Sequence, residues 1–379
     1  MPKIRVKAET AAQLVRKRIF YGDHAVSGIP SERTMAKEFG ISRETLRGAL
    51  RLLEAEGVLV RQANGRLTVA QKWQLSDKKP IIGFVKHSNP SHDHELWREG
   101  VCGALEGRNC ILRTVTFEHY GDAAIAGALS GFDGVFFLPP AEDIPAWLAS
   151  KMRQADTRVV VVDQDATAAG LRSVVMFPPQ AERKLLEHLV QLGHLRIDCL
   201  NTQARDPIIE GRIETWRAFL RENNLLGQLH SLTEFNPLNS SYQLVKNRLR
   251  EGRSIGAALI CTTGPAALGA MRAFYEERAW VGRNVSVCAV NDEGLGPFLT
   301  PSLTCLQAEA RAGYLQNAVE WMCGGEWLGP LLVQPNDVPM FVGESTGPAP
   351  ADTNVIILNS KERAAADDGG AVPALARAG

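Results

Sequence analysis

From Pro80 to about residue 346, short apolar runs alternate with stretches of helical periodicity, and this alternation is the strongest constraint on the fold. The apolar runs contain almost no polar residues, which suits strands that are buried on both faces. Such strands separated by helices are typical of parallel sheets covered by helices on both sides. We therefore expect an α/β fold, and the length of the region favours two similar lobes. The expected strands are 81–85, 135–138, 159–162, 257–261 and 285–290, and the expected helices lie near 93–107, 178–192, 208–223, 265–278 and 308–322.

The first 70 residues follow a different pattern, with three helical segments before a hairpin. The helices are expected at about 9–21, 31–40 and 42–57. Two short β-type runs then flank Asn64-Gly65, which is the strongest short-range signal for a hairpin turn. Three helices followed by a hairpin is the order of a winged helix-turn-helix.

The composition divides the chain into four expected regions. Residues 1–70 form the winged helix-turn-helix head, and 71–79 form a polar linker. Residues 80–346 form the α/β body. Residues 347–379 are rich in Ala, Gly, Pro and charge, which predicts a mostly disordered tail. Within this tail the apolar residues 355–358 suit a short edge strand.

A net charge of zero hides an asymmetry between the two ends of the chain. Residues 1–72 carry seven more basic than acidic side chains, and the rest of the chain carries an equal acidic excess. A basic head on an acidic body favours a polyanionic partner. A basic surface without any partner is the alternative, so the motifs of the head must decide between the two.

The third expected helix carries arginines on one face and leucines on a neighbouring face. The arginines are Arg43, Arg47 and Arg51, and the leucines are Leu46, Leu50 and Leu53. Outward arginines can bridge phosphates and donate paired hydrogen bonds to guanine edges, and short hydroxyl side chains can add further bonds. A solvated face, with Glu44 and Glu54 as ion-pair partners, is the alternative.

Three stretches of the head, IPSER (29–33), GISRETLR (40–47) and LEAEGVLV (53–60), closely resemble the GntR family of winged-helix regulators. The resemblance covers about residues 9–69. It implies that the third helix enters the major groove of DNA and that the hairpin wing touches the minor groove. The wing sequence RQANGRLT departs from the commoner R-x-G-x-G-T pattern, which leaves the wing's role open. The implied DNA contacts are Arg33, Ser42, Arg43, Thr45 and Arg47, with Gly65 and Arg66 in the wing.

In the body, polar residues follow several of the expected strands. Ligands of α/β folds lie beyond the carboxyl ends of the strands, so these residues are candidates for a binding site. Each of them also suits the cap of a following helix, and both interpretations stay open. The residues are His87-Ser88, Asp163-Gln164-Asp165, Thr262-Thr263 and Asn291-Asp292.

The body resembles the ligand-binding domain of the LacI/GalR family, which is related to periplasmic sugar-binding proteins. The stretches that carry the resemblance are LVQLGH (189–194), GRIETW (211–216), ALGAMRA (267–273), VSV (285–287), LTPSLT (299–304) and EST (344–346). It implies two Rossmann-like lobes with parallel sheets, hinged by crossover strands, and an effector between them. It also places the family's sugar-contacting arginine at Arg212 and an aspartate of the first lobe at Asp163.

Two positions depart from the LacI/GalR pattern. Thr263-Gly264 stand where the family has Asn-Asp, and Asn291 stands where it has a ligand-contacting aspartate. Loss of these acceptors puts an ordinary sugar in doubt and leaves a modified sugar, another metabolite or a weakened site open. The candidate effector-binding residues are His87, Ser88, Asp163, Arg212, Thr263 and Asn291.

These features together predict a sequence-specific transcription regulator, by default a repressor, that binds an inverted-repeat operator as a homodimer. A small molecule, a sugar or related metabolite, would modulate its DNA affinity. The basic N-terminus has no apolar run after it, and no apolar run in the chain is long enough to span a membrane, so we expect a cytoplasmic protein. No cofactor is expected.

Other classes fit the sequence less well. An α/β enzyme is the competing class, but the chain has no G-x-S-x-G elbow, P-loop or H-E-x-x-H motif. His92-Asp93-His94 offers a pair of metal ligands without an evident third, which favours a polar loop leading into a helix. A transport receptor would need an export signal and would lack the head. The seven scattered cysteines form no Cys-x-x-Cys pair, so we expect them to be reduced.

Overall fold

The computed structural model describes residues 8–21, 23–24, 28–70, 79–232, 236–350 and 355–356. The chain forms two compact units, and each is assembled from separate stretches of sequence. The chain therefore passes repeatedly from one unit to the other, as expected for lobes joined by crossover strands. Unit 1 comprises Met1–Pro140, Ile144–Val175 and Ala310–Val333, and unit 2 comprises Ala141–Asp143, Met176–Glu309 and Gln334–Gly379.

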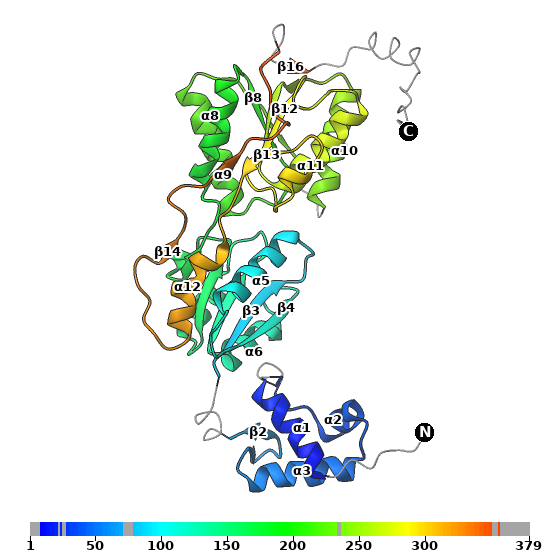
Figure 1. Cartoon of the computed structure of the whole chain (residues 1–379), viewed down its shortest axis with the longest axis vertical. Coiled ribbons are helices and arrows are strands. Elements are labelled where there is room, and N and C mark those ends of the chain that lie inside the picture. The colour runs from blue at the N-terminus through cyan, green and yellow to red at the C-terminus, as the bar shows by residue number, and fades with distance from the viewer. Residues whose placement is uncertain are drawn as a thin grey trace, which may run out of the picture. The chain divides into compact units, whose positions relative to one another are not determined.

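Between Ala8 and Ala70 the described residues form the predicted three helices and hairpin around a core of their own (Figure 1). The elements are α1 (Ala8–Phe20), α2 (Glu32–Phe39), α3 (Arg43–Ala55), β1 (Leu59–Arg61) and β2 (Leu67–Val69). Leu46, Leu50 and Leu53 of α3 are buried in this core, as their spacing predicts. Packing explains the glycine at position 48 in the middle of α3, because a Cβ there would lie 3.2 Å from the Cβ of Ala8. A glycine thus allows α1 and α3 to approach closely.

The rest of unit 1 is built on a six-stranded sheet in which every pairing is parallel. In sheet order the strands are β14 (Leu332–Val333), β7 (Arg172–Val174), β6 (Arg158–Val162), β5 (Gly134–Leu138), β3 (Ile81–His87) and β4 (Ile111–Phe117). The helices are α5 (His92–Ala104), α6 (Ala123–Gly131), α7 (Ala146–Gln154), η1 (Thr167–Ala169) and α12 (Arg311–Met322). The buried side chains of α6 and α7 pack on Val85, Val135 and Val161 of the sheet.

Unit 2 has a second six-stranded sheet, parallel except for its edge strand β15. In sheet order the strands are β15 (Met340–Phe341), β13 (Thr304–Leu306), β12 (Ser286–Ala289), β11 (Ala258–Cys261), β8 (Ile197–Asn201) and β9 (Leu229–Ser231). The helices are η2 (Pro179–Glu182), α8 (Arg183–Gln191), α9 (Pro207–Glu222), α10 (Pro237–Arg250), α11 (Gly264–Glu276) and η3 (Gly296–Phe298).

Both sheets follow one strand order, in which the first strand lies between the second and the third. The order therefore reverses between β3 and β5 in unit 1 and between β8 and β11 in unit 2. In doubly wound folds ligands bind at the carboxyl ends of the strands at such a switch point. The predicted α/β class, with parallel sheets and two Rossmann-like lobes behind a winged helix-turn-helix, is confirmed.

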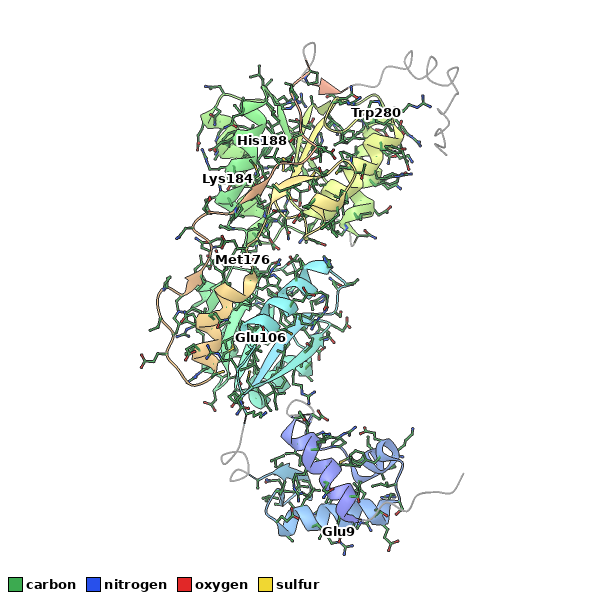
Figure 2. All side chains as sticks on the ribbon, in the orientation of Figure 1. Glu9, Glu106, Met176, Lys184, His188 and Trp280 are labelled. Atoms are coloured by element: carbon green, nitrogen blue, oxygen red, sulfur yellow. The ribbon has the colours of Figure 1, made fainter. Side chains whose placement is uncertain are left out.

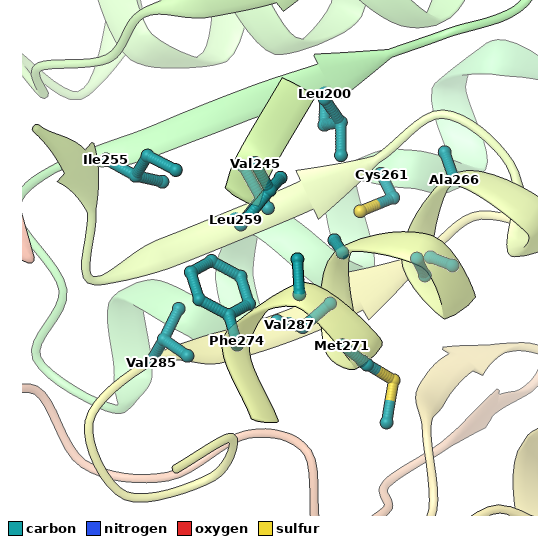
Figure 3. Close-up of a cluster of buried hydrophobic side chains, with 14 of the residues drawn as sticks. Leu200, Val245, Ile255, Leu259, Cys261, Ala266, Met271, Phe274, Val285 and Val287 are labelled. Carbon is teal, nitrogen blue, oxygen red and sulfur yellow. The ribbon is translucent and has the colours of Figure 1, made fainter. Parts of the chain in front are cut away.

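Helices cover both faces of the unit 2 sheet, with α8 and α9 on one side and α10 and α11 on the other (Figure 1). Figure 3 shows the core on the second side, where Leu259 and Val287 of the sheet meet Phe274 of α11 and Val245 of α10. These side chains are at most 1% exposed, so the sheet is buried on this face as the apolar strands predict.

Helix α8 forms hydrogen bonds with the C-terminal segment of unit 2, residues 338–349. Lys184 and His188, labelled one turn apart in Figure 2, both contact the returning chain. The ammonium of Lys184 donates to the carbonyl of Val338 at 2.8 Å, and Nε2 of His188 lies 2.9 Å from Oγ1 of Thr346. The backbone N–H of Ala349 donates to the carbonyl of the residue that caps α8, at 2.8 Å. The C-terminal stretch is thus an integral part of unit 2 at least as far as this residue.

A buried carboxylate on β8 is fully hydrogen-bonded. Asp198 is 0% exposed and accepts hydrogen bonds from Arg196 at 3.0 Å, from His230 at 2.8 Å and from the backbone N–H of Gly256 at 2.8 Å and of Gln228 at 2.9 Å. Burial alone would raise the pKa of this carboxyl, but the hydrogen bonds from His230, Arg196 and Gly256 lower it overall. Asp198 is therefore a charged structural centre that joins β8, β9 and β10 (Ile255–Gly256).

Several smaller predictions concern the ends and the cysteines. The expected linker lies outside the described residues except for Lys79, and so does most of the expected disordered tail. Val355–Ile356 of that tail forms β16, which pairs antiparallel with β10 as the possible edge strand. All seven cysteines are free. Among the described residues, no helix is long and apolar enough to cross a membrane.

Candidate DNA interface and effector site

Helices α2 and α3 are joined by a tight turn whose ends are capped by side-chain and backbone bonds. Gly40 closes α2 with φ of 63°, a left-handed conformation that glycine adopts without strain. Ser42 then caps α3, because its Oγ accepts the backbone N–H of Thr45 at 3.0 Å. The hydroxyls of Ser42 and Thr45 also bond each other at 2.8 Å. Two predicted DNA contacts therefore form the start of the helix.

Helix α3 separates its apolar and basic residues onto two faces. The buried residues are Leu46, Ala49, Leu50 and Leu53, each at most 1% exposed, and the exposed basic residues are Arg43, Arg47 and Arg51. In the described part of the chain, no ion pair is formed by Arg43 or Arg51, nor by the exposed Arg33 at the start of α2. These guanidinium groups are always charged and face solvent, so they are free to meet an anionic polymer.

Arg47 differs from its neighbours, because it has an internal partner. Its Nη2 lies 3.1 Å and its Nε 3.2 Å from the same carboxylate oxygen of Glu32 on α2. The Arg47 side chain is still 52% exposed, and exposed ion pairs are worth at most about 1 kcal/mol. A phosphate or a guanine edge can therefore compete with Glu32 for Arg47 at little cost.

The hairpin wing is braced against α3. Its tip turns at Gly65, with φ of 78°, and the backbone N–H of Arg66 donates to Oδ1 of Asn64 at 3.0 Å. Arg61 donates to Glu54 of α3 at 2.9 Å and to the carbonyl of Gly65 at 3.0 Å. The side chain of Arg61 thus positions the wing, and the exposed Arg66 is the basic group at its tip.

The three candidate effector residues of unit 1 lie at the ends of β3 and β6: His87 ends β3, Ser88 follows it, and Asp163 follows β6. Nε2 of His87 lies 3.0 Å from the carbonyl of Glu118, and Ser88 donates to the carboxylate of Glu118 at 2.8 Å. These two side chains thus join the ends of β3 and β4. Asp163 follows β6 with φ of 66°, and its backbone N–H donates to the carbonyl of Val174 at 2.9 Å. A left-handed aspartate is uncommon and points to a constrained position.

The three candidates of unit 2 lie at the carboxyl ends of its strands. Nη1 of Arg212, on α9, donates to the carbonyl of Thr262 at 2.7 Å, directly after β11. Thr263 is the N-cap residue of α11, but its hydroxyl makes no capping bond. Oδ1 of Asn291, after β12, accepts the N–H of Glu293 at 2.9 Å. Arg212 and Thr263 are 6% and 8% exposed.

Two glycines bring these segments into direct contact. A Cβ at Gly264 would lie 2.5 Å from the carbonyl oxygen of Asn291, so the turn after β11 packs on the turn after β12. A Cβ at Gly211 would lie 2.7 Å from Pro179, so α9 packs equally closely on η2. The structure thus gathers Arg212, Thr263 and Asn291 at one end of the unit 2 sheet.

A further polar residue of this region was not predicted from the sequence. Glu182, the last residue of η2, is 0% exposed, and neither of its carboxyl oxygens has a hydrogen-bond partner among the described residues. Burial raises the pKa of Glu182 to about 8, against the opposing charge of Arg212. A signal was available, because Glu182 precedes the buried Leu185, Leu186 and Leu189 at helical spacing and so stands on an apolar face.

The His92-Asp93-His94 segment at the start of α5 contributes a buried imidazole and an ion pair between helices. Burial lowers the pKa of His94 to about 4, with a smaller contribution from Lys86, so its imidazole is neutral at ordinary pH. Asp93 accepts a hydrogen bond from Arg311 of α12 at 2.6 Å. Over the residues that the structure describes, no group of three or more His, Cys, Asp or Glu side chains is placed to hold a metal ion.

Comparison with protein families finds two matching domains. Residues 7–69 match the model of bacterial regulatory proteins of the gntR family, and residues 186–314 match that of the periplasmic binding protein-like domain. The chain thus combines a GntR-type head with a periplasmic-binding-protein-like domain, as the two resemblances implied. The match of the head contains α2, α3 and the wing, and that of the second domain contains Arg212, Thr263 and Asn291.

Curated relatives and solved structures agree with this assignment. The chain is 24% identical over 160 residues to the HTH-type transcriptional regulator GalR of Streptococcus thermophilus, covering 41% of this chain and 48% of the relative. It is 27% identical over 141 residues to the lactose operon repressor of Escherichia coli (strain K12), covering 37% of this chain and 39% of the relative. The chain thus spans less than half the length of these two relatives, both of which are transcription regulators.

Among solved structures, the Lac repressor bound to ONPG in its repressed state superposes with a TM-score of 0.62 at 18% identity, covering 90% of this chain and all of that one. The transcription regulator CcpA of Lactococcus lactis superposes with a TM-score of 0.59 at 14% identity, covering 71% of this chain and 100% of that one. At these identities the likeness concerns the fold.

Proposed function

We propose that this protein is a sequence-specific DNA-binding transcription regulator, a repressor, whose operator affinity changes when its C-terminal domain binds a small molecule. The observation that carries the proposal is the geometry of α3. This helix is capped at Ser42, anchored by buried leucines and lined on its outer face by Arg43, Arg47 and Arg51. The basic excess of the head supplies the sequence-independent part of the attraction to DNA.

The seven predicted DNA contacts lie on α2, on α3 with its cap, and on the wing. Arg43 and Arg47 read base edges from α3, while Arg33, Ser42 and Thr45 bind phosphates beside it. Gly65 and Arg66 form the tip of the wing and meet the backbone or the minor groove. Six of these residues are exposed on the head and Thr45 is half-buried, which supports the assignment.

The protein acts as a homodimer on an inverted repeat, because two identical heads related by a two-fold axis match two half-sites. Unit 2 exposes the apolar side chains of Leu295 and Phe298, at 38% and 85%, and a second copy can cover them. The protein is not an enzyme, and it works in the cytoplasm, where the chromosome of a bacterial cell lies. The effector-binding residues are His87, Ser88 and Asp163 in unit 1 and Arg212, Thr263 and Asn291 in unit 2.

Fluorescence anisotropy on a duplex from upstream of the coding sequence tests the proposal. The wild-type protein should bind tightly and selectively, and the double variant Arg43→Ala/Arg47→Ala should lose about 2–6 kcal/mol, at 1–3 kcal/mol for each base-reading side chain. Arg221→Ala, which removes an exposed arginine of unit 2, is the control and should bind as the wild type does. Equal binding by all three proteins, indifferent to DNA sequence, would contradict the proposal.

A further inference from the structure

Four buried polar atoms in one region of unit 2 have no hydrogen-bond partner within the described residues. They are both carboxyl oxygens of Glu182, Nε of Arg212 and Oγ1 of Thr263. The three residues are 0%, 6% and 8% exposed, so water does not compensate them freely. Buried polar groups are almost always paired in folded proteins, and a cluster of unpaired ones requires an explanation.

The arrangement of Arg212 and Thr263 is that of an anion site. The bond from Arg212 to the carbonyl of Thr262 fixes the guanidinium beside the first turn of α11. That turn has a partial positive charge, and the N–H groups of Gly264 and Ala266 have no acceptor within the helix. Pro265 between them has no N–H to contribute. The place is also the switch point between β8 and β11, where doubly wound folds bind their ligands.

We propose that the effector is an anion, a small metabolite with a carboxylate or phosphate group that binds to Arg212, the hydroxyl of Thr263 and the N-terminus of α11. This inference rests on the proposed function, in which the C-terminal domain holds the effector. The unpaired Nε of Arg212 and the unused hydroxyl of Thr263 donate hydrogen bonds to the anionic group. Backbone N–H groups of α11 complete its coordination.

The local balance of charge supports an anion over a neutral sugar. Thr263-Gly264 and Asn291 supply no carboxylate at the positions where the resemblance leads one to expect acids. Asp292 already accepts the N–H groups of Gly294 and Gly296 at 2.9 and 3.0 Å. Asp206 likewise caps α9 by accepting the N–H of Ile209 at 2.7 Å. Arg212 interacts with the charge of Asp206 but forms no ion pair with either carboxylate, so its unpaired Nε is available to a ligand.

Glu182 favours an anionic ligand further, because its protonated carboxyl adds no negative charge near Arg212. An ionised carboxylate with no donor on either oxygen is strongly disfavoured at 0% exposure, and a protonated one is tolerated. The groups that interact with it are Arg212 from α9 and the thiols of Cys199 from β8 and Cys288 from β12. Burial holds the pKa of both thiols well above its ordinary value. Below about pH 8 Glu182 therefore does not compete with an anion for Arg212.

Isothermal titration calorimetry of the full-length protein at pH 6.5 and constant ionic strength tests the inference. The probes are inorganic phosphate and glucose 6-phosphate, gluconate as the carboxylate, and glucose as the uncharged counterpart. At least one anionic probe should bind, with an affinity at least about tenfold above that of glucose. Binding by the phosphates alone or by gluconate alone identifies the anionic group. No binding by any anion, or equal binding of glucose, would overturn the inference.

Variants connect the binding to the named residues. Arg212→Gln should weaken the best anionic probe by at least about tenfold, and Thr263→Val, which keeps the shape of the side chain, should weaken it by a few fold. Arg221→Gln, on the same helix but exposed, is the matched control and should leave the affinity unchanged. Circular dichroism checks that each variant is folded. Retained affinity in folded Arg212→Gln would overturn the inference.

The protonation of Glu182 is tested by the pH dependence of sulfate binding. Sulfate is used because its own charge does not change near neutral pH. Wild-type affinity for sulfate should fall by about tenfold from pH 6.5 to pH 9.5 as Glu182 ionises, and Glu182→Gln should lack most of this fall. An equal fall in both proteins would contradict a neutral Glu182. DNA binding without ligand is measured in parallel, so a regulator that binds DNA but no anion refutes this inference alone.

Discussion

Arginine is used in opposite ways in the two units. On α3 of the head, Arg43 and Arg51 are exposed, have no carboxylate partner in the described part of the chain and form a row on a helix surface. On α9 of unit 2, Arg212 is 6% exposed and is fixed by one backbone carbonyl. An exposed row suits a long polymer whose phosphates it can follow, whereas a buried single guanidinium suits one small anion. Exposure therefore distinguishes the two proposed binding sites more clearly than residue type does.

The largest expected effect is a double dissociation between the two kinds of arginine. Arg43→Ala/Arg47→Ala should reduce operator affinity by about 30-fold to 10⁴-fold and leave anion binding intact. Arg212→Gln should remove anion binding and leave the affinity for DNA without ligand intact. Anisotropy and calorimetry on the same preparations measure both. Loss of both functions in either variant would break the comparison, because it would mean a general loss of folding or one shared site.

An effect of intermediate size is expected in the pH dependence of the free energy of unfolding, which should differ between the buried carboxyls of Glu182 and Asp198. The folded pKa of Glu182, about 8, is above the ordinary value of 4.5, so the folded state keeps a proton that the unfolded state loses between these pH values. The free energy of unfolding should therefore fall with rising pH in this window, at up to about 1.4 kcal/mol per pH unit, and Glu182→Gln should lack this fall. Urea titrations followed by tryptophan fluorescence from pH 5 to 8 measure it.

Asp198→Asn is the matched control, with the opposite sign. The folded pKa of Asp198 is lowered, so the stability that it contributes is present above its unfolded pKa and is lost as the pH falls. The variant should destabilise unit 2 most at neutral pH and much less in acid. A flat pH profile for Glu182→Gln relative to the wild type would show that its carboxyl is solvated, and the contrast with Asp198 would fail.

The smallest effect concerns the two hydroxyls at helix starts. Ser42 caps α3, so Ser42→Ala should cost about 1 kcal/mol of local stability and speed amide exchange in the first turn of α3 about fivefold. Thr263 makes no capping bond, so Thr263→Val should leave exchange in the first turn of α11 nearly unchanged. Hydrogen exchange of the full-length protein measures both. Similar acceleration at the two helices would mean that Thr263 caps α11 in solution and is not reserved for a ligand.

The head could be predicted almost completely from the sequence, because its organisation is local. The period of the leucines places α3 against the core, and the same period places Arg43 on the opposite face. Ser42 and Gly40 mark the helix ends through interactions within a few residues of themselves. The pairing of Arg47 with Glu32 could not be foreseen, since it joins two helices whose crossing is set by packing.

Five strands of the body were predicted from their apolar runs, but others, such as β4 and β8, were not, because polar residues interrupt their apolar ones. The polar network of the body was not predicted either. His87 and Ser88 lie at a strand end as expected, yet their partner Glu118 comes directly after the neighbouring strand β4. Asp198 acquires four donors from three different segments, and Glu182 acquires none. Whether a buried carboxyl is paired depends on contacts across the sheet, which no periodicity along one segment records.

The most direct test of the account is selection of binding sites from a pool of randomised duplex DNA by the full-length protein, followed by sequencing. The wild-type protein should enrich an inverted repeat whose two half-sites match two α3 helices. That enrichment should disappear with Arg43→Ala/Arg47→Ala and persist with Arg221→Ala. A wild-type protein that enriches no sequence over the starting pool would contradict the assignment of the head as a sequence-specific DNA reader, and with it the regulatory function.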